Sequence, residues 1–278
     1  MSFSISASNS SVALSLLSGI TGSSGSPDLV SIANGLGGTG STVDPVSALT
    51  QAETNETKDV AIQAQQPTTK AEINRFLAVV GKASTLQDIM KDPTARKVFL
   101  SANGLGDQVD YTALATKALL SKPTDKTSLA ATLSNTAWLS AVTTFDFADK
   151  GLSVLKTPKV LTTITNGYAQ YVWSRQQDQN TPGLSAALDF RSRAHTVTTV
   201  DGILGDANIR AVVTGALGIP QQIAFQPIPT QEKAISDKLD VKKLQDPKFV
   251  EQLAREYLIQ NQASLAGSAT SPITSLLA

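Results

Sequence analysis

The residue types best able to take part in catalysis or ligand binding occur together in the stretch Asp189-Phe190-Arg191-Ser192-Arg193-Ala194-His195. It contains the single histidine, His195, together with two arginines and a carboxylate. Such a set could act in acid–base catalysis or bind an anion. Arg191 and Arg193 are two residues apart, however, so their side chains would diverge on a helix. No neighbouring residue supplies a nucleophile with a base and an orienting third group, and we therefore expect a solvated helix face here.

A glycine-rich stretch, Gly35-Leu36-Gly37-Gly38-Thr39-Gly40, satisfies the spacing G-x-G-x-x-G. This spacing lets a backbone approach a pyrophosphate at a helix N-terminus, but it does so only after a strand and within a βαβ unit. The sequence indicates neither. As a phosphate loop ending in Gly40-Ser41-Thr42, the stretch lacks the lysine that would reach the phosphates. We expect a linker.

The segment 150–195 carries six lysines and arginines against two aspartates, and Tyr168, Tyr171 and Trp173 lie among these charges. Basic and aromatic residues together could form a weak nucleic-acid surface. Tyr168 and Tyr171 share one face at helical spacing, and scattered charges make a poor phosphate-binding stripe. Core packing is therefore the better interpretation.

Composition restricts the remaining chemistry. The chain has 278 residues, 41% of them apolar, which is enough to fill a core. Its 23 basic and 23 acidic residues cancel, so no overall field attracts nucleic acid or acidic membranes. Zero cysteines exclude disulfides, a thiolate nucleophile and cysteine-ligated metals, and one histidine cannot build a multi-histidine site. We expect no catalytic residue, no cofactor and no metal.

The positions of the prolines predict a helical protein. Asp or Thr immediately before Pro is the pairing of a helix N-cap with the first helical residue. Five prolines follow this pattern, in Asp44-Pro45, Asp92-Pro93, Thr157-Pro158, Thr181-Pro182 and Asp246-Pro247. Capping boxes add starts at Thr69…Glu72 and Ser84…Gln87. Only 194–200 and 223–228 could be extended, and neither alternates convincingly.

Apolar periodicity agrees with these helix starts. After Asp92, four apolar residues from Ala95 to Ala102 fall at i, i+3, i+4 and i+7, and Gly104 supplies a left-handed stop. Glu251 and Arg255 form an exposed i,i+4 pair. The predicted core residues are Val98, Phe99, Leu105, Trp138, Leu139, Phe145, Val212, Val213, Phe249, Leu253 and Tyr257.

An internal duplication relates residues 89–105 to residues 203–219, at a shift of 114. The identities are Ile89/Ile203, Asp92/Asp206, Arg96/Arg210, Val98/Val212, Ala102/Ala216 and Gly104/Gly218. Further along, the pattern around Trp138 resembles that around Phe249, with a large aromatic in the first turn of a helix. The alternative is that capped amphipathic helices resemble one another in any case. We expect Arg96 and Arg210 to form intramolecular ion pairs, with contact to a partner as the alternative.

These patterns predict an all-α, multihelical protein with two related halves, 84–150 and 198–262, around a shared core. Residues 44–262 form one domain, and a long helical segment from Thr157 to about Thr199 joins the halves. Residues 1–43 contain a single charged residue and are rich in Ser and Gly, and residues 263–278 are similarly poor in charge. Such compositions do not repay the entropy of ordering. We expect both ends to be flexible tails.

No export signal or membrane span is indicated. The first basic residue is Lys58, so the N-terminus lacks the positive region of a secretory signal peptide. No window approaches the roughly 18 to 20 apolar residues that cross a bilayer. We expect no membrane insertion.

Part of the chain resembles the bacterial domain-of-unknown-function-1217 family, over residues 76–259. The resemblance rests on Asp92 leading into Ala102-x-Gly104-Leu105, on Ala118-Leu119-Leu120-Ser121, on Leu133-Ser134-Asn135-x-x-Trp138 and on Phe145-Asp146-Phe147. Members of this family are characteristically encoded beside flagellar genes in alphaproteobacteria and have no established activity. The resemblance implies a flagellum-linked protein and transfers no catalytic residue.

We therefore expect a non-catalytic protein that acts in flagellar structure or assembly through a protein partner, and not through nucleic acid. The first alternative is a cytoplasmic regulator or chaperone-like binding protein that is not exported, and an enzyme of unknown type is the third. The expected location is the bacterial flagellum or the cytoplasm. The low-charge, cysteine-free N-terminal arm is compatible with export through the flagellar channel.

Overall fold

The computed structural model describes residues 44–269, and every regular element in them is an α-helix or a 3₁₀ helix. The all-α prediction is confirmed. The first half comprises α3 (Pro45–Gln65), α4 (Pro67–Lys82), α5 (Leu86–Lys91), α6 (Pro93–Ala102), η1 (Gly106–Gln108), α7 (Thr112–Leu119), α8 (Leu129–Thr132), α9 (Thr136–Phe145), α10 (Phe147–Lys150) and η2 (Gly151–Lys156). The glycine-rich stretch 35–40 and most of the two predicted tails lie outside the described residues.

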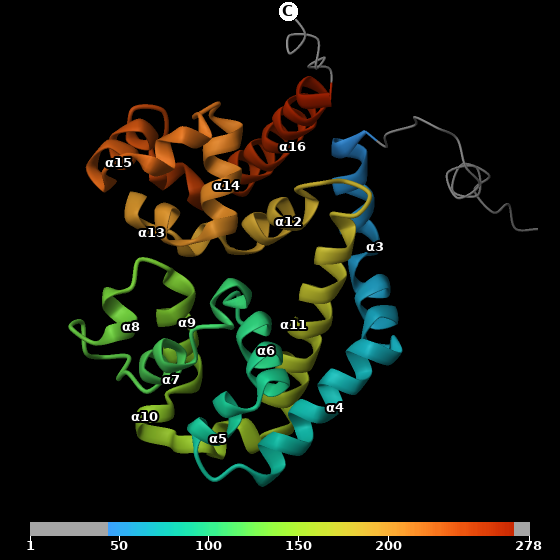
Figure 1. Cartoon of the computed structure of the whole chain (residues 1–278), viewed down its shortest axis with the longest axis vertical. Helices are drawn as coiled ribbons and strands as arrows, with labels where there is room; N and C mark the ends of the chain where they lie inside the picture. Colours follow the sequence, from blue (N-terminus) through green and yellow to red (C-terminus); the bar gives the residue numbers. More distant parts are fainter. Residues whose placement is uncertain (1–43, 270–278) are drawn as a thin grey trace, which may run out of the picture. The chain divides into compact units, whose positions relative to one another are not determined.

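The chain continues through α11 (Pro158–Gln177), α12 (Leu184–Arg193), η3 (Ala194–Thr196), α13 (Val200–Gly205), α14 (Ala207–Ala216), η4 (Gln221–Phe225), α15 (Ile228–Ser236), η5 (Val241–Gln245) and α16 (Pro247–Ala269) (Figure 1). Helix α16 runs past the boundary predicted at residue 262. The two segments that could have been extended, 194–200 and 223–228, contain no strand. The first holds the 3₁₀ helix η3 and the start of α13, and the second holds the end of the 3₁₀ helix η4 and the start of α15. No helix in 44–269 is both long and apolar enough to cross a membrane.

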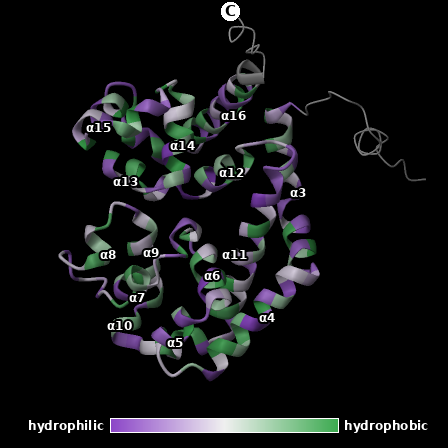
Figure 2. Ribbon diagram, in the orientation of Figure 1, coloured by the Kyte–Doolittle hydropathy of each residue, from purple (hydrophilic) through white to green (hydrophobic). Residues whose placement is uncertain are grey.

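The described residues pack into two hydrophobic clusters instead of the one shared core predicted. The first cluster is built from α4 to α10 and the first part of α11, around Phe99, Trp138 and Tyr168. The second is built from α3, the end of α11 and α12 to α16, around Phe190 and Val213. Hydrophobic and hydrophilic residues alternate along the helices (Figure 2), as one-sided burial requires. Each cluster contains one copy of the duplicated stretch.

Helix α11 belongs to both clusters. Its Ile164 and Tyr168 are buried in the first cluster, and its Trp173 is buried in the second. The predicted long helical segment from Thr157 to about Thr199 is largely helical, but it is interrupted between α11 and α12. Gly183 adopts φ 91°, and α12 begins one residue later. A left-handed backbone suits glycine, and Gly183 is the N-cap of α12, so Thr181 is not the N-cap that its proline neighbour suggested.

Most other predicted helix starts are observed. Asp44, Asp92 and Asp246 accept backbone N–H bonds from the first turns of α3, α6 and α16. Helix α11 begins at Pro158, although the Thr157 side chain makes no cap bond.

Both predicted capping boxes are misplaced. The box before α5 uses Thr85 and Asp88, one residue later than the predicted Ser84…Gln87 pair. Thr69 lies inside α4, where its hydroxyl is buried and accepts a 2.8 Å bond from Gln63 Nε2. Neighbouring Ser and Thr residues offer nearly equivalent cap oxygens, so sequence alone cannot separate them.

The two duplicated stretches repeat their local geometry. Thr85 and Thr199, which are related by the same shift, cap α5 and α13 with their side-chain oxygens. Asp92 and Asp206 cap α6 and α14, which have ten residues each. Both of these helices end in the same motif. Gly104 and Gly218 have φ 73° and 60°, and the next residue donates back to a carbonyl five residues earlier, at 2.9 and 2.8 Å.

The predicted core is buried with two exceptions. Leu139 is 38% exposed, because the buried stripe of α9 runs through Trp138, Ala141, Val142 and Phe145 and turns Leu139 outward. Phe249 is only partly buried and packs on the edge of the second cluster. Val98, Phe99, Leu105, Trp138, Phe145, Val212, Val213, Leu253 and Tyr257 are buried as predicted.

Candidate functional site

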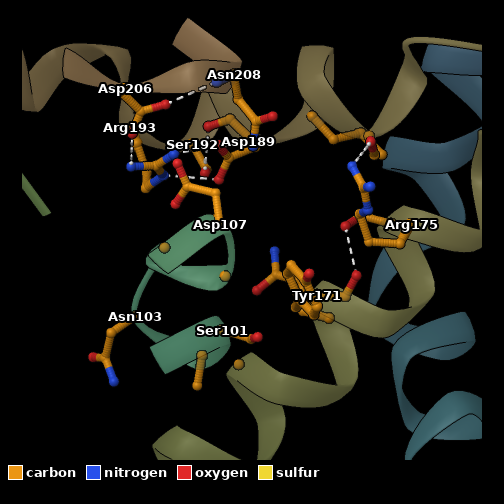
Figure 3. Close-up of a pocket in the computed structure, with 18 of the residues that line it drawn as sticks. Ser101, Asn103, Asp107, Tyr171, Arg175, Asp189, Ser192, Arg193, Asp206 and Asn208 are labelled. Atoms are coloured by element: carbon orange, nitrogen blue, oxygen red, sulfur yellow. Dashed lines mark hydrogen bonds and ion pairs between the residues drawn. The ribbon is translucent and has the colours of Figure 1, made fainter. Parts of the chain in front are cut away.

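A cleft of about 460 Å³ lies where the two duplicated halves meet. Its walls come from the C-terminal end of α6, from one face of α11, from α12 and from the N-terminus of α14. Figure 3 shows Arg193, Asp189, Asp206 and Asn208 gathered on one side, with Tyr171 and Arg175 of α11 apart from them. The volume lies within the range of small-molecule sites, about 300–1,000 Å³. The cleft is therefore a candidate functional site.

Arg193 is the centre of the charged side of this cleft. Its Nε donates to Asp189 Oδ1 at 2.7 Å, its Nη2 donates to Asp189 Oδ2, and its Nη1 donates to Asp206 Oδ2 at 2.8 Å. Asn208 Nδ2 also donates to Asp189 Oδ2, at 2.9 Å. The guanidinium is thus held by two carboxylates, one of them in a two-bond fork.

Two opposing effects act on the pKa of Arg193. Burial lowers it, because a buried cation loses hydration, while the hydrogen bonds and charge of Asp189, followed by those of Asp206, raise it. The carboxylates prevail and the pKa is raised. This arginine stays charged, and its role in the cleft is to neutralise two buried or half-buried acids.

The Arg193 cluster also lies beside the end of α6 in the first half. Asp206 Oδ1 caps α14 by accepting from the backbone N–H groups of Asn208 and Ile209, at 3.0 and 3.1 Å. On the other side, a Cβ added to Gly104 would lie 3.1 Å from the Arg193 guanidinium. The end of α6 in the first half therefore approaches the arginine that holds the start of α14 in the second.

The prediction of a solvated helix face for 189–195 is wrong in its main part. Arg191 and Arg193 do diverge, but each reaches acids of other helices: Arg191 pairs with Glu53 of α3 and lies 3.7 Å from Glu251 of α16. Glu251 also pairs with Arg255, as predicted. Helix α12 lies between α3, α14 and α16, so its polar residues face neighbours. His195 is exposed in η3 and is not among the residues that line the cleft.

The aromatic residues of the basic segment serve packing, as expected. Tyr168 and Trp173 are buried, and the Tyr168 hydroxyl donates to Glu72 Oε2. Burial, the hydrogen bond to Glu72 and the Glu72 charge all raise the pKa of Tyr168. Lys97 completes this group, with its Nζ 2.7 Å from Glu72 Oε1. These rings are not available to stack on bases.

The expected ion pairs of Arg96 and Arg210 are not observed among the described residues. Instead each arginine donates from Nη1 to a backbone carbonyl at the end of the preceding short helix: Arg96 to Met90 at 2.7 Å, and Arg210 to Leu204 at 2.6 Å. Met90 and Leu204 are also related by the shift of 114. Arg96 alone makes a second bond, from Nε to Val109 O at 2.8 Å.

A second cavity, of about 870 Å³, lies wholly in the second half. It begins at the glycine-terminated end of α14, where Gly215 and Gly218 are the equivalents of Ser101 and Gly104 in the first cleft. The cavity extends under η4 to α16 and includes Arg210 and Phe225. Phe225 is 88% exposed and Ile228, three residues further on, is 54% exposed. We call this the η4 cavity.

The roles of Asp189, Asp206 and Asn208 in the cleft were not predicted from the sequence. One signal was present, because Asp189 and Arg193 have the i,i+4 spacing of a helical ion pair. Asp206 was identified only as a cap. The described residues contain no group of three or more His, Asp or Glu side chains able to hold a metal ion.

A family model and a solved structure match this chain. No curated protein matches the chain. A crystal structure of a structural-genomics target protein from Agrobacterium tumefaciens is similar, with a TM-score of 0.65 and 21% identity, over 82% of this chain and 98% of that one. At this identity the similarity shows a shared fold. The model of the protein family of unknown function DUF1217 matches residues 102–250, more than half of the chain, and the chain therefore belongs to that family.

Proposed function

We propose that this chain is a non-catalytic protein of the bacterial flagellum that acts in structure or assembly by binding another protein. The observation that carries the proposal is Phe225 at the rim of the η4 cavity. A phenylalanine ring that is 88% exposed lacks most of the stabilisation that burial of a large apolar side chain provides, about 1.5–3 kcal/mol. Exposed aromatic anchors beside a concave surface are the usual centres of protein interfaces.

The state of the cleft charges supports a non-catalytic role. A general acid or base must be free to exchange a proton with a substrate. Asp189 and Asp206 are instead held by Arg193, and Asp206 also caps a helix. Arg175 lies 3.8 Å from Asp178, and its Nη1 donates to Ser185. The charged groups of the cleft are thus occupied in fixing α11, α12 and α14.

The flagellar setting is supported by the family's characteristic position beside flagellar genes. Deleting the gene and scoring swimming and filament assembly tests it directly. We expect impaired swimming that is restored by the wild-type chain but not by Phe225→Ser. Ile62→Ser is the matched control, because Ile62 is 50% exposed on α3 and does not line the η4 cavity. Normal swimming with intact filaments in the deletion strain would overturn the flagellar proposal.

The second candidate is a cytoplasmic regulator or chaperone-like binding protein, which the same exposed ring would also serve. Localisation separates the two. Recovery of the full-length protein from purified filaments or from culture medium favours the first. Recovery only from the cytoplasm, with a partner captured by the wild-type chain and not by Phe225→Ser, favours the second.

A further inference from the structure

We propose that the η4 cavity binds a second copy of this chain: the loop 106–111 of one molecule enters the cavity of the next, with Asp110 beside Arg210 and Tyr111 against Phe225. The inference rests on the proposed interaction function and names the partner of that surface. Four observations lead to it.

The first observation is that the two equivalent arginines are not equally satisfied. Arg96 uses Nη1 for the Met90 carbonyl and Nε for the Val109 carbonyl. Arg210 repeats the first bond, to Leu204, but makes no bond to Ile223, the equivalent of Val109. Arg210 is exposed, and within the described part of the chain its Nε and Nη2 groups have no protein partner. Arg210 and Ile223 both line the η4 cavity.

The second observation is the charge of the η4 cavity. Arg210 is the only charged residue among those that line it. The remaining walls are apolar, with Ile219, Ile223 and Phe225, or carry neutral amides and the Tyr257 hydroxyl. Burial and the Asp178 charge raise the pKa of Tyr257, so this hydroxyl remains neutral. A complementary occupant carries a carboxylate next to an apolar or aromatic side chain.

The third observation is that the chain itself carries such a segment. Loop 106–111 presents Asp110 and Tyr111 at the surface: Tyr111 is 59% exposed, and Asp110 is exposed with no hydrogen bond or ion pair to another described residue. Asp107 adds a second acid in the same loop. These residues are far in sequence from the η4 cavity, on the equivalent loop of the other half.

The fourth observation is how the two loops differ. At the shift of 114, Asp107, Asp110 and Tyr111 correspond to Gln221, Ala224 and Phe225. The second loop has no acid at either position and has an exposed aromatic where the first loop has Tyr111. One half therefore presents an acidic loop with an aromatic tip, and the other presents a basic cavity with an aromatic rim. The halves are complementary to each other instead of self-complementary.

This complementarity determines the type of assembly. Loop and cavity are different surfaces, so the contact is heterologous, and each molecule keeps one free loop and one free cavity. Repetition gives open head-to-tail oligomers, whereas a two-fold dimer would need one self-complementary patch. Because the contact includes a charge pair at a partly exposed site, salt weakens it.

Sedimentation velocity of the full chain tests the proposal. We expect the weight-average sedimentation coefficient of the wild type to rise as the protein concentration is raised to about 200 µM, which detects a micromolar Kd. Added NaCl should lower this coefficient. Arg210→Glu and Asp110→Ala should each sediment as monomers, while Lys126→Glu, a charge reversal at an exposed position outside loop 106–111 and outside the residues that line the η4 cavity, should associate as the wild type does. Circular dichroism shows that each variant is folded.

Mixing the two monomeric variants is the decisive measurement. Arg210→Glu retains an intact acidic loop and Asp110→Ala retains an intact cavity, so an equimolar mixture can form one native contact per pair. The other loop and the other cavity, which carry the two substitutions, have no opposite charges to pair. We expect dimers and no larger species. A wild type that stays monomeric, or a mixture that shows no dimer, overturns the self-docking. Either result leaves the proposed function to its own complementation assay, in which Phe225→Ser is scored by swimming and not by self-association.

Discussion

Arg193 Nη1 lies 2.8 Å from Asp206 Oδ2, while the other oxygen of the same carboxyl group caps α14. One buried acid thus begins a helix of the second half and also anchors the last residue of α12. The two tasks use different oxygens, so they do not compete. This explains why Asp206, although charged, is 2% exposed.

Arg193→Ala should lower the free energy of unfolding by about 3–5 kcal/mol, because it leaves Asp206 buried without its counter-charge. Urea titration measures the loss. Arg175→Ala is the control, since that arginine side chain is 57% exposed and pairs at 3.8 Å, and it should cost less than about 1 kcal/mol. Equal losses in the two variants would show that the Arg193 cluster does not stabilise the fold.

Trp138→Ala should cost about 3–5 kcal/mol, because the indole ring is buried in the first cluster and its removal leaves a large cavity. The neighbouring Leu139→Ala should cost less than about 1 kcal/mol, since Leu139 faces outward. Both values come from denaturant titration of otherwise identical chains. A loss below about 1 kcal/mol for Trp138→Ala would contradict the register of α9.

Gly205→Ala should destabilise the chain by about 1–3 kcal/mol through overpacking. A Cβ at this position would lie 2.5 Å from the Ser134 backbone, where α13 of the second half meets the start of α9 in the first. Gly81→Ala is the matched substitution with the opposite sign. It lies in α4 with no atom within 4 Å of the added carbon, and it should stabilise by about 0.4–1 kcal/mol. Thermal midpoints of both variants test the pair.

Glu232→Gln should raise the thermal midpoint at pH 7. A side-chain hydrogen bond with Asp201, followed by burial and the Asp201 charge, raises the pKa of Glu232. A carboxyl group whose folded pKa is raised contributes stability below its unfolded pKa, and this contribution is lost as the pH rises through the folded pKa. Replacing the carboxyl by an amide removes the repulsion at pH 7 and changes little at pH 3.

Asp125→Asn should behave in the opposite way and serves as the control for the pH series. Side-chain and backbone hydrogen bonds from Thr127 lower the pKa of Asp125. Its contribution to stability is present above the unfolded pKa and is lost as the pH falls. The variant should therefore lower the midpoint at pH 7 and match the wild type at pH 3. Shifts of the same sign in both variants would rule out these assignments.

Local physics made much of the fold predictable from sequence. Asp92 and Gly104 mark the ends of α6 because a cap oxygen and a left-handed glycine act within a few residues of the chain. Their equivalents, Asp206 and Gly218, do the same in the second half. A helix start was predicted at Thr181-Pro182, but α12 begins at Leu184, after Gly183. Its position depends on Asp178, whose carboxylate accepts from Ser185 N seven residues later at 2.8 Å, and the sequence pattern did not show this contact.

The cleft was not predictable in the same way. Arg193 meets Asp206 only because α13 and its flanking turns bring residues 13 apart together. A spacing of 13 residues does not indicate a contact between two side chains, whereas the i,i+4 spacing of Asp189 and Arg193 does so on a helix. For Arg96 and Arg210, the sequence predicted ion pairs at equivalent positions, whereas the structure shows only that their Nη1 bonds are equivalent. The sequence could not reveal that backbone carbonyls, which every residue carries, would be their partners.

The position of α11 in both clusters has a consequence for unfolding. Tyr168 and Trp173 are little more than one helical turn apart, yet each completes a different apolar core. Unfolding of α11 from either end removes buried side chains from one of the two cores. Neither half can therefore unfold at low free-energy cost while the other stays folded. Heat should therefore disrupt the whole helical body in one cooperative transition, despite its divided interior.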